Sequence, residues 1–198
     1  MEPKAKKKRQ DIQSPQMEQP SLEVSMLNKD NFSDEELESY LSKGAIKASE
    51  EITVPPKILF VGDCTIATFG NFSASTGKAK SKKTFNVSAM VAAAVTNTTV
   101  LNYRACLPEG KRNILYFDTE QSKYHCHTVL ERIYKLSGLS LKQDDPRLMF
   151  WGLREYTPKL RIAVIDYALR KYEGVGLVII DGLRDLMYDI NNGKEATD

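Results

Sequence analysis

The fold is decided by a stretch that reads Gly77-Lys78-Ala79-Lys80-Ser81-Lys82-Lys83-Thr84. A phosphate-binding loop needs inward-facing backbone N–H groups, a helix that begins behind them, a lysine that reaches the outer phosphates and a Ser or Thr hydroxyl on the metal. The positions of Gly77, Lys83 and Thr84 have the required spacing. The pattern also has a glycine just before the lysine, where this chain has Lys82. The stretch alone therefore fits either a P-loop or a basic loop that binds no nucleotide.

Two further segments place acids where a P-loop protein uses them. Asp181 ends the apolar run Leu177-Val178-Ile179-Ile180, where a carboxylate can hold magnesium through water. The segment Tyr116-Phe117-Asp118-Thr119-Glu120-Gln121-Ser122 is a strand that ends in acids, one of which can polarise an attacking water. Ligands of open parallel sheets gather at the carboxyl ends of the strands. Lys83, Glu120 and Asp181 therefore form a candidate constellation, although an acid that simply terminates a buried strand remains an alternative for Asp181.

The segments around these motifs alternate between strand and helix. Short β-prone runs at 58–61 and 65–69 flank the turn signal Gly62-Asp63 and predict a hairpin, and a third extended run at 71–76 leads into Gly77. The other expected elements are a buried helix at 85–95, a strand at 114–117, a helix at 124–136, a strand at 148–153, a helix after Thr157-Pro158 with Leu160, Ala163, Tyr167 and Ala168 on its inner face, and a strand at 177–180 buried on both faces. This alternation predicts βαβ units and an α/β fold with a mainly parallel sheet.

Segments 73–85, 116–122 and 177–183 together resemble the core of RecA-like P-loop ATPases, particularly the RepA-type AAA-family ATPases of plasmids and mobile elements of Bacteroides-type bacteria. The resemblance covers about residues 57–198 and implies a three-layer domain. It also implies roles for individual residues. The nucleotide would lie against the loop from Gly77 through Lys78, Ala79, Lys80, Ser81, Lys82, Lys83 and Thr84 to Phe85, with Lys83 on the β- and γ-phosphates, Thr84 and Asp181 on Mg²⁺, and Glu120 as the catalytic glutamate.

The same resemblance implies that the protein hydrolyses Mg-ATP to ADP and phosphate. It further implies a homo-oligomer, a ring or a filament, that acts on DNA in replication or mobilisation of a plasmid or transposon. Two other classes of function also fit the residues. One is a nucleotide-gated DNA-binding or regulatory switch with little hydrolysis, and the other is a structural nucleic-acid binder that uses its lysine clusters.

The resemblance further implies a strand that this chain does not supply. The resemblance makes Asp181 the Walker B acid and the run that ends in it the Walker B strand. In RecA-like sheets a further strand follows the Walker B strand in sequence and lies between it and the P-loop strand. The residues after Asp181 allow only a short helical turn through Leu183, Leu186 and Met187. We therefore expect the chain to be truncated after the Walker B strand, poorly stable alone and nearly inactive as an ATPase.

The N-terminal part differs in composition from the rest. Residues 1–30 predict a disordered basic tail, whose cluster Lys4-Ala5-Lys6-Lys7-Lys8-Arg9 suits a solvated tail, a DNA-contacting arm or a nuclear-import signal. Residues 31–56 predict a short accessory helix and a linker, because Ser33-Asp34-Glu35-Glu36 is a capping box. The remaining residues, 57–198, make up the partial ATPase core.

Composition excludes several other classes of protein. The chain has 198 residues, of which 41% are hydrophobic, and no apolar run approaches the roughly 20 residues that cross a bilayer. Its three cysteines are far apart, which argues against a disulfide framework and predicts a cytoplasmic protein. The net charge of +2 does not by itself indicate nucleic-acid binding.

Three other groups of residues are weaker candidates. The run His125-Cys126-His127 is a poor metal site, because residues one and two apart on a helix point in different directions. Phe150 and Trp151 suit either the core or a wall beside the adenine. A phosphate sensor or a trans-acting finger would be an arginine, and the candidates are Arg154, Arg161 and Arg184, although a solvated or salt-bridged arginine fits each of them better.

Overall fold

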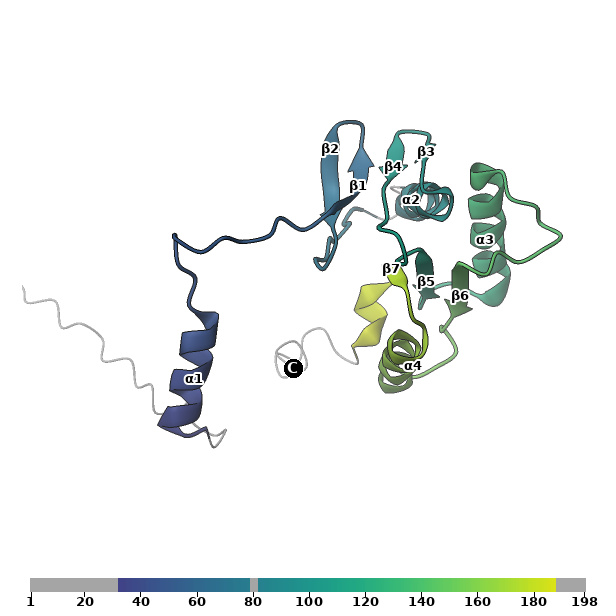
Figure 1. Cartoon of the computed structure of the whole chain (residues 1–198). Helices are drawn as coiled ribbons and strands as arrows, with labels where there is room; N and C mark the ends of the chain where they lie inside the picture. The colour runs from purple at the N-terminus through teal and green to yellow at the C-terminus, as the bar shows by residue number, and fades with distance from the viewer. Residues whose placement is uncertain (1–31, 79–81, 188–198) are drawn as a thin grey trace, which may run out of the picture. The chain divides into compact units, whose positions relative to one another are not determined.

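The computed structural model describes residues 32–78 and 82–187. Figure 1 labels its helices and strands in the order of the chain. The predicted tail at 1–30 lies outside the described residues. The elements are α1 (Asp34–Gly44), β1 (Lys57–Val61), β2 (Cys64–Thr68), α2 (Lys83–Thr96), β3 (Thr99–Val100), β4 (Tyr103–Ala105), β5 (Asn113–Asp118), α3 (Lys123–Ser137), β6 (Leu148–Gly152), α4 (Pro158–Lys171), β7 (Val175–Asp181) and the 3₁₀ helix η2 (Leu183–Leu186).

The chain divides into two units, Met1–Ile52 and Thr53–Asp198. The described part of the first unit contains α1, whose predicted capping box is confirmed. The backbone N–H of Ser33 donates to Glu36 Oε2 at 2.9 Å, and the backbone N–H of Glu36 donates to Ser33 Oγ at 3.2 Å. Both N–H groups belong to the unpaired set at a helix start, so the box stabilises this end of α1.

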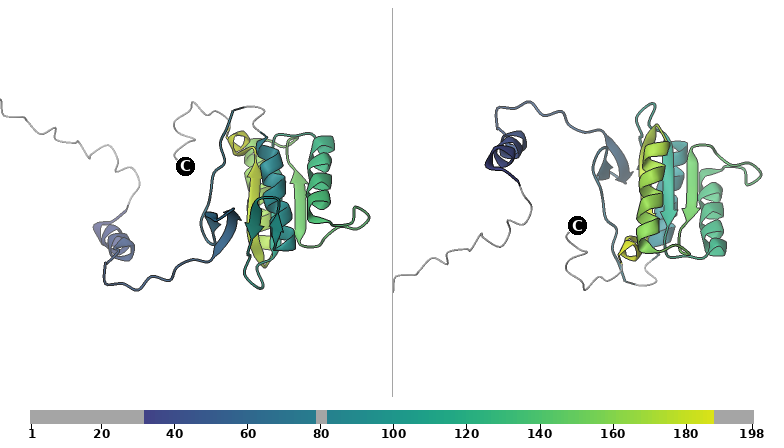
Figure 2. Two further views of the ribbon diagram at one scale, coloured as in Figure 1. Left: turned by 90° about the horizontal axis from the view of Figure 1, so that it is seen from above. Right: turned by 90° about the horizontal axis from the view of Figure 1, so that it is seen from below.

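The second unit is built on a parallel sheet with strand order β6-β5-β7. Its central strand, β5, is buried from Ile114 to Asp118. One face of the sheet packs against α2 and α3, and the other packs against α4. Figure 2 shows α2 over the strands from above, with α3 beside β6, and α4 over the strands from below. The predicted α/β class is confirmed, with helices on both faces of a parallel sheet.

A second, antiparallel sheet has the order β2-β1-β4-β3. The predicted hairpin at its edge is confirmed, since β1 and β2 pair antiparallel around Gly62-Asp63. The sequence did not predict β3 and β4. These strands are two and three residues long, which is too short for an alternating pattern to appear.

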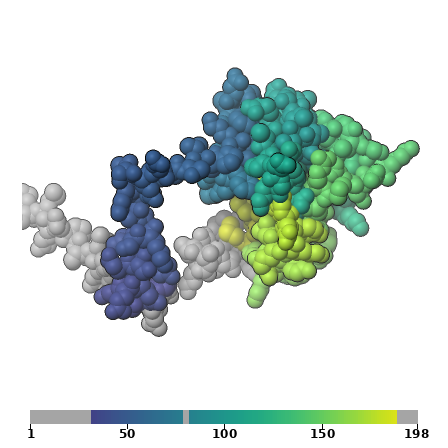
Figure 3. All heavy atoms as spheres, in the orientation of Figure 1, coloured from purple at the N-terminus to yellow at the C-terminus, as the bar shows by residue number. Residues whose placement is uncertain are grey.

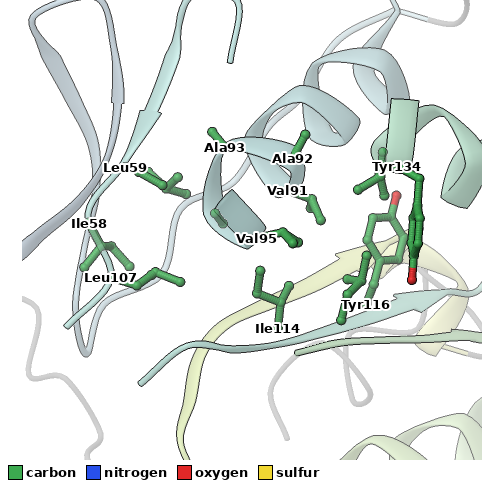
Figure 4. Close-up of a cluster of buried hydrophobic side chains, with 14 of the residues drawn as sticks. Ile58, Leu59, Val91, Ala92, Ala93, Val95, Leu107, Ile114, Tyr116 and Tyr134 are labelled. Carbon is green, nitrogen blue, oxygen red and sulfur yellow. The ribbon is translucent and has the colours of Figure 1, made fainter. Parts of the chain in front are cut away.

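Helix α2 lies between the two sheets. Its side chains Val91, Ala92 and Val95 are almost fully buried, as predicted for this apolar helix. Figure 4 shows Val91 and Val95 above Ile114 of the parallel sheet, with Leu59 of the antiparallel sheet on another side of the helix. A helix enclosed in this way is held firmly, so the position of its first turn is fixed relative to the end of β5.

The prediction of a strand at 71–76 is wrong. Residues 71–78 form no strand, and Phe72 is 95% exposed. Local polar contacts replace strand pairing here: the Asn71 amide donates to Thr68 Oγ1 at 2.8 Å, and the Ser73 hydroxyl donates to the Ile66 carbonyl. Asn and Ser side chains that bond nearby groups compete with strand formation in this way. The chain thus reaches Gly77 as an irregular segment.

The prediction of the inner face of α4 is also wrong for three of its four residues. Ala168 is buried, but Leu160 and Tyr167 are 47% and 57% exposed, and Ala163 is exposed as well. Atoms of α4 are uncovered on the face shown in Figure 3. Ile165 and Ala168 face the sheet instead. The Arg161 guanidinium donates to the carbonyls of Leu153, Arg154 and Asp185, which ties the start of α4 to the end of β6 and to η2.

Strand β7 is less buried than its apolar run predicts. Gly176 is buried, but the side chains from Leu177 to Ile180 are only partly so. In the described residues β7 pairs with β5 alone, and so it forms an edge of the three-stranded sheet. No described helix combines the length and the apolar character needed to cross a membrane.

Candidate nucleotide site

The carboxyl ends of β5, β6 and β7 are joined by backbone hydrogen bonds. Asp118 is in register with Asp181 on one side and with Gly152 on the other. The N–H of Thr119 donates to the Asp181 carbonyl at 3.0 Å, and the N–H of Leu153 donates to the Asp118 carbonyl at 2.7 Å. The two acids at the strand ends are therefore held side by side on a rigid edge, at the position where ligands of parallel sheets bind.

The first turn of α2 meets this edge. Thr84 Oγ1 donates to Asp181 Oδ2 at 3.2 Å, across 97 positions of sequence. The Lys83 ammonium turns back over the loop and donates to the carbonyls of Gly77 at 2.8 Å and Lys78 at 3.4 Å. The structure thus joins Thr84 to Asp181, two residues that the sequence predicted as parts of one site, while the Lys83 ammonium contacts the loop. Of the other predicted loop residues, Ala79, Lys80 and Ser81 lie outside the described residues, and Phe85 is 42% exposed in the first turn of α2.

Lys82 explains how the loop departs from the P-loop pattern. This residue is the N-cap of α2 and adopts the left-handed conformation, with φ 60° and ψ 26°. Glycine occupies that conformation without steric cost, whereas a residue with a Cβ is strained in it by roughly 1–2 kcal/mol. The backbone at Lys82 therefore has the shape for which the pattern specifies glycine, although the residue is a lysine.

Replacing Lys82 with glycine is therefore expected to stabilise the second unit by about 0.5–1 kcal/mol. Relief of the strain exceeds the extra chain entropy that glycine adds to the unfolded state. Urea unfolding measures the difference. Leu101→Gly is the parallel test, because Leu101 is also left-handed, with φ 53°, and its exposed side chain leaves the same strain to be relieved by glycine. A Lys82→Gly protein less stable than the wild type would contradict the left-handed geometry at the start of α2.

The two acids near the end of β5 have different surroundings. Asp118 is fully buried, and its carboxylate accepts hydrogen bonds from the backbone N–H groups of Glu120 and Gln121 and from the Gln121 amide. Burial raises the pKa of Asp118, and the neighbouring Asp181 raises it further, while these donors act in the opposite direction. Glu120 is exposed beyond the end of the strand. Asp118 therefore shapes the turn, and Glu120 is the acid that solvent can reach.

Two residues that the sequence did not single out also contact the β7 end. The Tyr116 hydroxyl donates to Asp181 Oδ2 at 3.1 Å, and the Thr119 hydroxyl donates to the Gly182 carbonyl at 2.7 Å. Gly182 has φ 102°, and a Cβ there would overlap Thr119 Oγ1, so this close turn requires glycine. Strand alternation could have found Tyr116, because it places residues 116 and 118 on the same face.

The remaining predicted residues lie around this edge without joining the cluster. Phe150 stacks on Tyr116 with ring centroids 4.2 Å apart, and Trp151 stacks on Phe117 at 5.0 Å, so both partly buried rings pack against the core. The Arg161 guanidinium is committed to backbone carbonyls, as described above. An arginine held in this way does not suit the role of an arginine finger, which must reach a phosphate. Arg154 and Arg184 are exposed.

Comparisons of the chain with models of protein families, with curated proteins and with solved structures found no match.

Proposed function

We propose that this chain binds Mg-ATP at the start of α2 and hydrolyses it to ADP and phosphate. The hydrogen bond between Thr84 and Asp181 is the observation that carries the proposal. It joins the hydroxyl of a P-loop-like sequence to an acid at the end of a parallel strand, which is the pairing that a P-loop ATPase needs to hold its metal.

The oxygen atoms at this point suit magnesium. Mg²⁺ takes oxygen ligands, and it is usually held by one or two protein groups together with waters and substrate phosphates. Thr84 Oγ1 and Asp181 Oδ2 are such oxygens, 3.2 Å apart. In the proposed site Thr84 and Asp181 would hold the ion, which when bound would neutralise charge on the phosphates.

The electrostatics at the start of α2 favour a phosphate group. The first turn contains no acid, and its cap residue, Lys82, makes no side-chain capping bond. The backbone N–H groups at a helix start carry partial positive charge, and Lys83 adds a full charge beside them. The Lys83 ammonium now donates to two loop carbonyls, and a phosphate oxygen is a stronger acceptor for it.

Glu120 is the residue that we propose as the acceptor of the water's proton. It follows β5 directly and is exposed, whereas both oxygens of the nearby Asp118 already accept hydrogen bonds. A general base must be free to take a proton from the nucleophile. The backbone N–H of Glu120 donates to Asp118 Oδ1 at 3.0 Å, so Asp118 would fix the backbone from which Glu120 acts.

Replacing Lys83 with alanine tests the proposed function. ATP affinity is expected to fall about 10- to 100-fold, because one charge-assisted interaction with the phosphates is lost. Isothermal titration calorimetry with ATP and magnesium measures the dissociation constant. Lys78→Ala removes a lysine of the same loop and is the matched control, expected to change affinity less than about threefold. Equal affinities for the wild type and Lys83→Ala would contradict a P-loop.

Action on DNA as a homo-oligomer extends this proposal and rests on the sequence resemblance alone. The assay that separates a motor from a nucleotide-gated switch is ATP turnover with and without single-stranded DNA. A motor shows turnover that DNA stimulates. A switch binds ATP and DNA but turns over slowly in both conditions.

A further inference from the structure

Tyr116 has a hydroxyl group at a buried position where hydrophobic packing alone would not need a polar group. The side chain is fully buried in β5, and its hydroxyl donates to Asp181 Oδ2 at 3.1 Å. The hydroxyl is therefore a buried donor whose acceptor is a carboxylate.

The strand register explains how the ring reaches this carboxylate. Tyr116 is in register with Ile179, and Asp181 is two residues further along β7 on the same face. Such diagonal neighbours are within reach of an aromatic side chain. Phe150 lies in β6, on the side of β5 away from β7. Its ring stacks on Tyr116, with the ring centroids 4.2 Å apart and an angle of 11° between the ring planes. The ring is thus held in the orientation that points its hydroxyl at Asp181.

We propose that Tyr116 is a positioning residue, which holds the Asp181 carboxylate in the orientation in which it serves the magnesium site. This inference rests on the proposed function. Asp181 Oδ2 accepts hydrogen bonds from both Thr84 and Tyr116. Thr84 lies in the first turn of α2 and would share its oxygen with the metal. Tyr116 lies in the core, so its contact with Asp181 does not depend on whether nucleotide is bound.

The test is Tyr116→Phe, which removes the hydroxyl and keeps the stacked ring. The matched control is Tyr134→Phe. Tyr134 is also buried, and its hydroxyl accepts the backbone N–H of Asp145 at 2.7 Å, away from Asp181. Figure 4 shows both tyrosines in the same core. The measurement is the magnesium concentration that half-saturates binding of a fluorescent ATP analogue to the full chain, with urea unfolding recorded in the absence of nucleotide.

Tyr116→Phe is expected to raise the half-saturating magnesium concentration about tenfold, because the lost hydrogen bond was to a charged group. Tyr134→Phe is expected to change it less than about twofold, since that hydroxyl bonds only backbone. Both variants lose one buried hydrogen bond, so the urea unfolding midpoints of both should fall, and that of Tyr116→Phe should fall more because its partner is charged. A double-mutant cycle with Asp181→Asn completes the test, because an effect that acts through Asp181 disappears when the carboxylate is absent.

Three outcomes overturn the inference. The first is a half-saturating magnesium concentration in Tyr116→Phe equal to that of the wild type. The second is a rise of this concentration in Tyr134→Phe as large as in Tyr116→Phe. The third is a tenfold rise caused by Tyr116→Phe that persists when Asp181 is already replaced by asparagine. A different result overturns the proposed function itself: a wild-type chain whose nucleotide binding does not depend on magnesium. The two failures are therefore distinguishable in one set of titrations.

Discussion

Replacing Glu120 with glutamine is expected to slow ATP hydrolysis about 10²- to 10⁴-fold, the usual cost of losing a general base. ATP affinity should stay within about twofold of the wild type, because glutamine keeps the size and polarity of the side chain and removes only its ability to accept a proton. Release of radiolabelled phosphate under single-turnover conditions measures the rate, and calorimetry measures the affinity.

Asp118→Asn is the control for this substitution, because Asp118 is the other acid that follows β5. Its carboxylate is buried and accepts three hydrogen bonds from the turn. An asparagine there keeps one acceptor but presents an NH₂ group to the Gln121 amide, so the expected effect is a loss of stability of about 1–3 kcal/mol. Normal hydrolysis by Glu120→Gln together with no hydrolysis by a folded Asp118→Asn would show that the base has been assigned to the wrong acid.

Replacing Gly176 with alanine is expected to destabilise the second unit by about 3 kcal/mol or more. Gly176 is buried in β7, and a Cβ there would overlap the Lys111 carbonyl oxygen and lie 2.9 Å from its carbonyl carbon. Backbone atoms cannot move aside as a flexible side chain can, so the strand itself must shift. Urea unfolding followed by circular dichroism measures the loss.

Gly152→Ala provides a graded comparison in the same sheet. A Cβ at Gly152 would lie 3.2 Å from the Cys126 sulfur, which belongs to a side chain that can adjust. The expected cost is about 1 kcal/mol or less. If the two variants were equally stable, the close approach of β7 to the segment at Lys111 would be contradicted.

The sequence predicted most of the parallel sheet and its helices because those elements have strong local signals. The apolar run of α2, the Thr157-Pro158 start of α4 and the alternation of strand and helix each arise from a few neighbouring residues, and the structure confirms all three. The prediction of the buried face of α4 was wrong for a different reason. Which residues face the sheet depends on long-range contacts, such as that of Arg161 with the Asp185 carbonyl, and helical periodicity carries no information about them.

The candidate site also combines features that the sequence predicted with features that it could not predict. Motif spacing identified Lys83, Thr84 and Asp181, and the structure joins Thr84 to Asp181, with Lys83 directly before Thr84 in α2. Spacing could not show that the backbone at Lys82 is left-handed, that Asp118 is enclosed by its own turn, or that Tyr116 contacts Asp181. Each of these facts depends on strand register or backbone angles, which follow from the packing of the whole unit. The motif thus gives the candidate chemistry, and the fold gives its supporting residues.

The most direct measurement of the central claim is a calorimetric titration of the wild-type chain with ATP, once in magnesium and once in EDTA. If Thr84 and Asp181 hold a metal for nucleotide at the start of α2, ATP binds saturably in magnesium, and its affinity falls at least about tenfold in EDTA. The same affinity in both titrations would contradict the metal site, and no binding in either would contradict the nucleotide site as a whole.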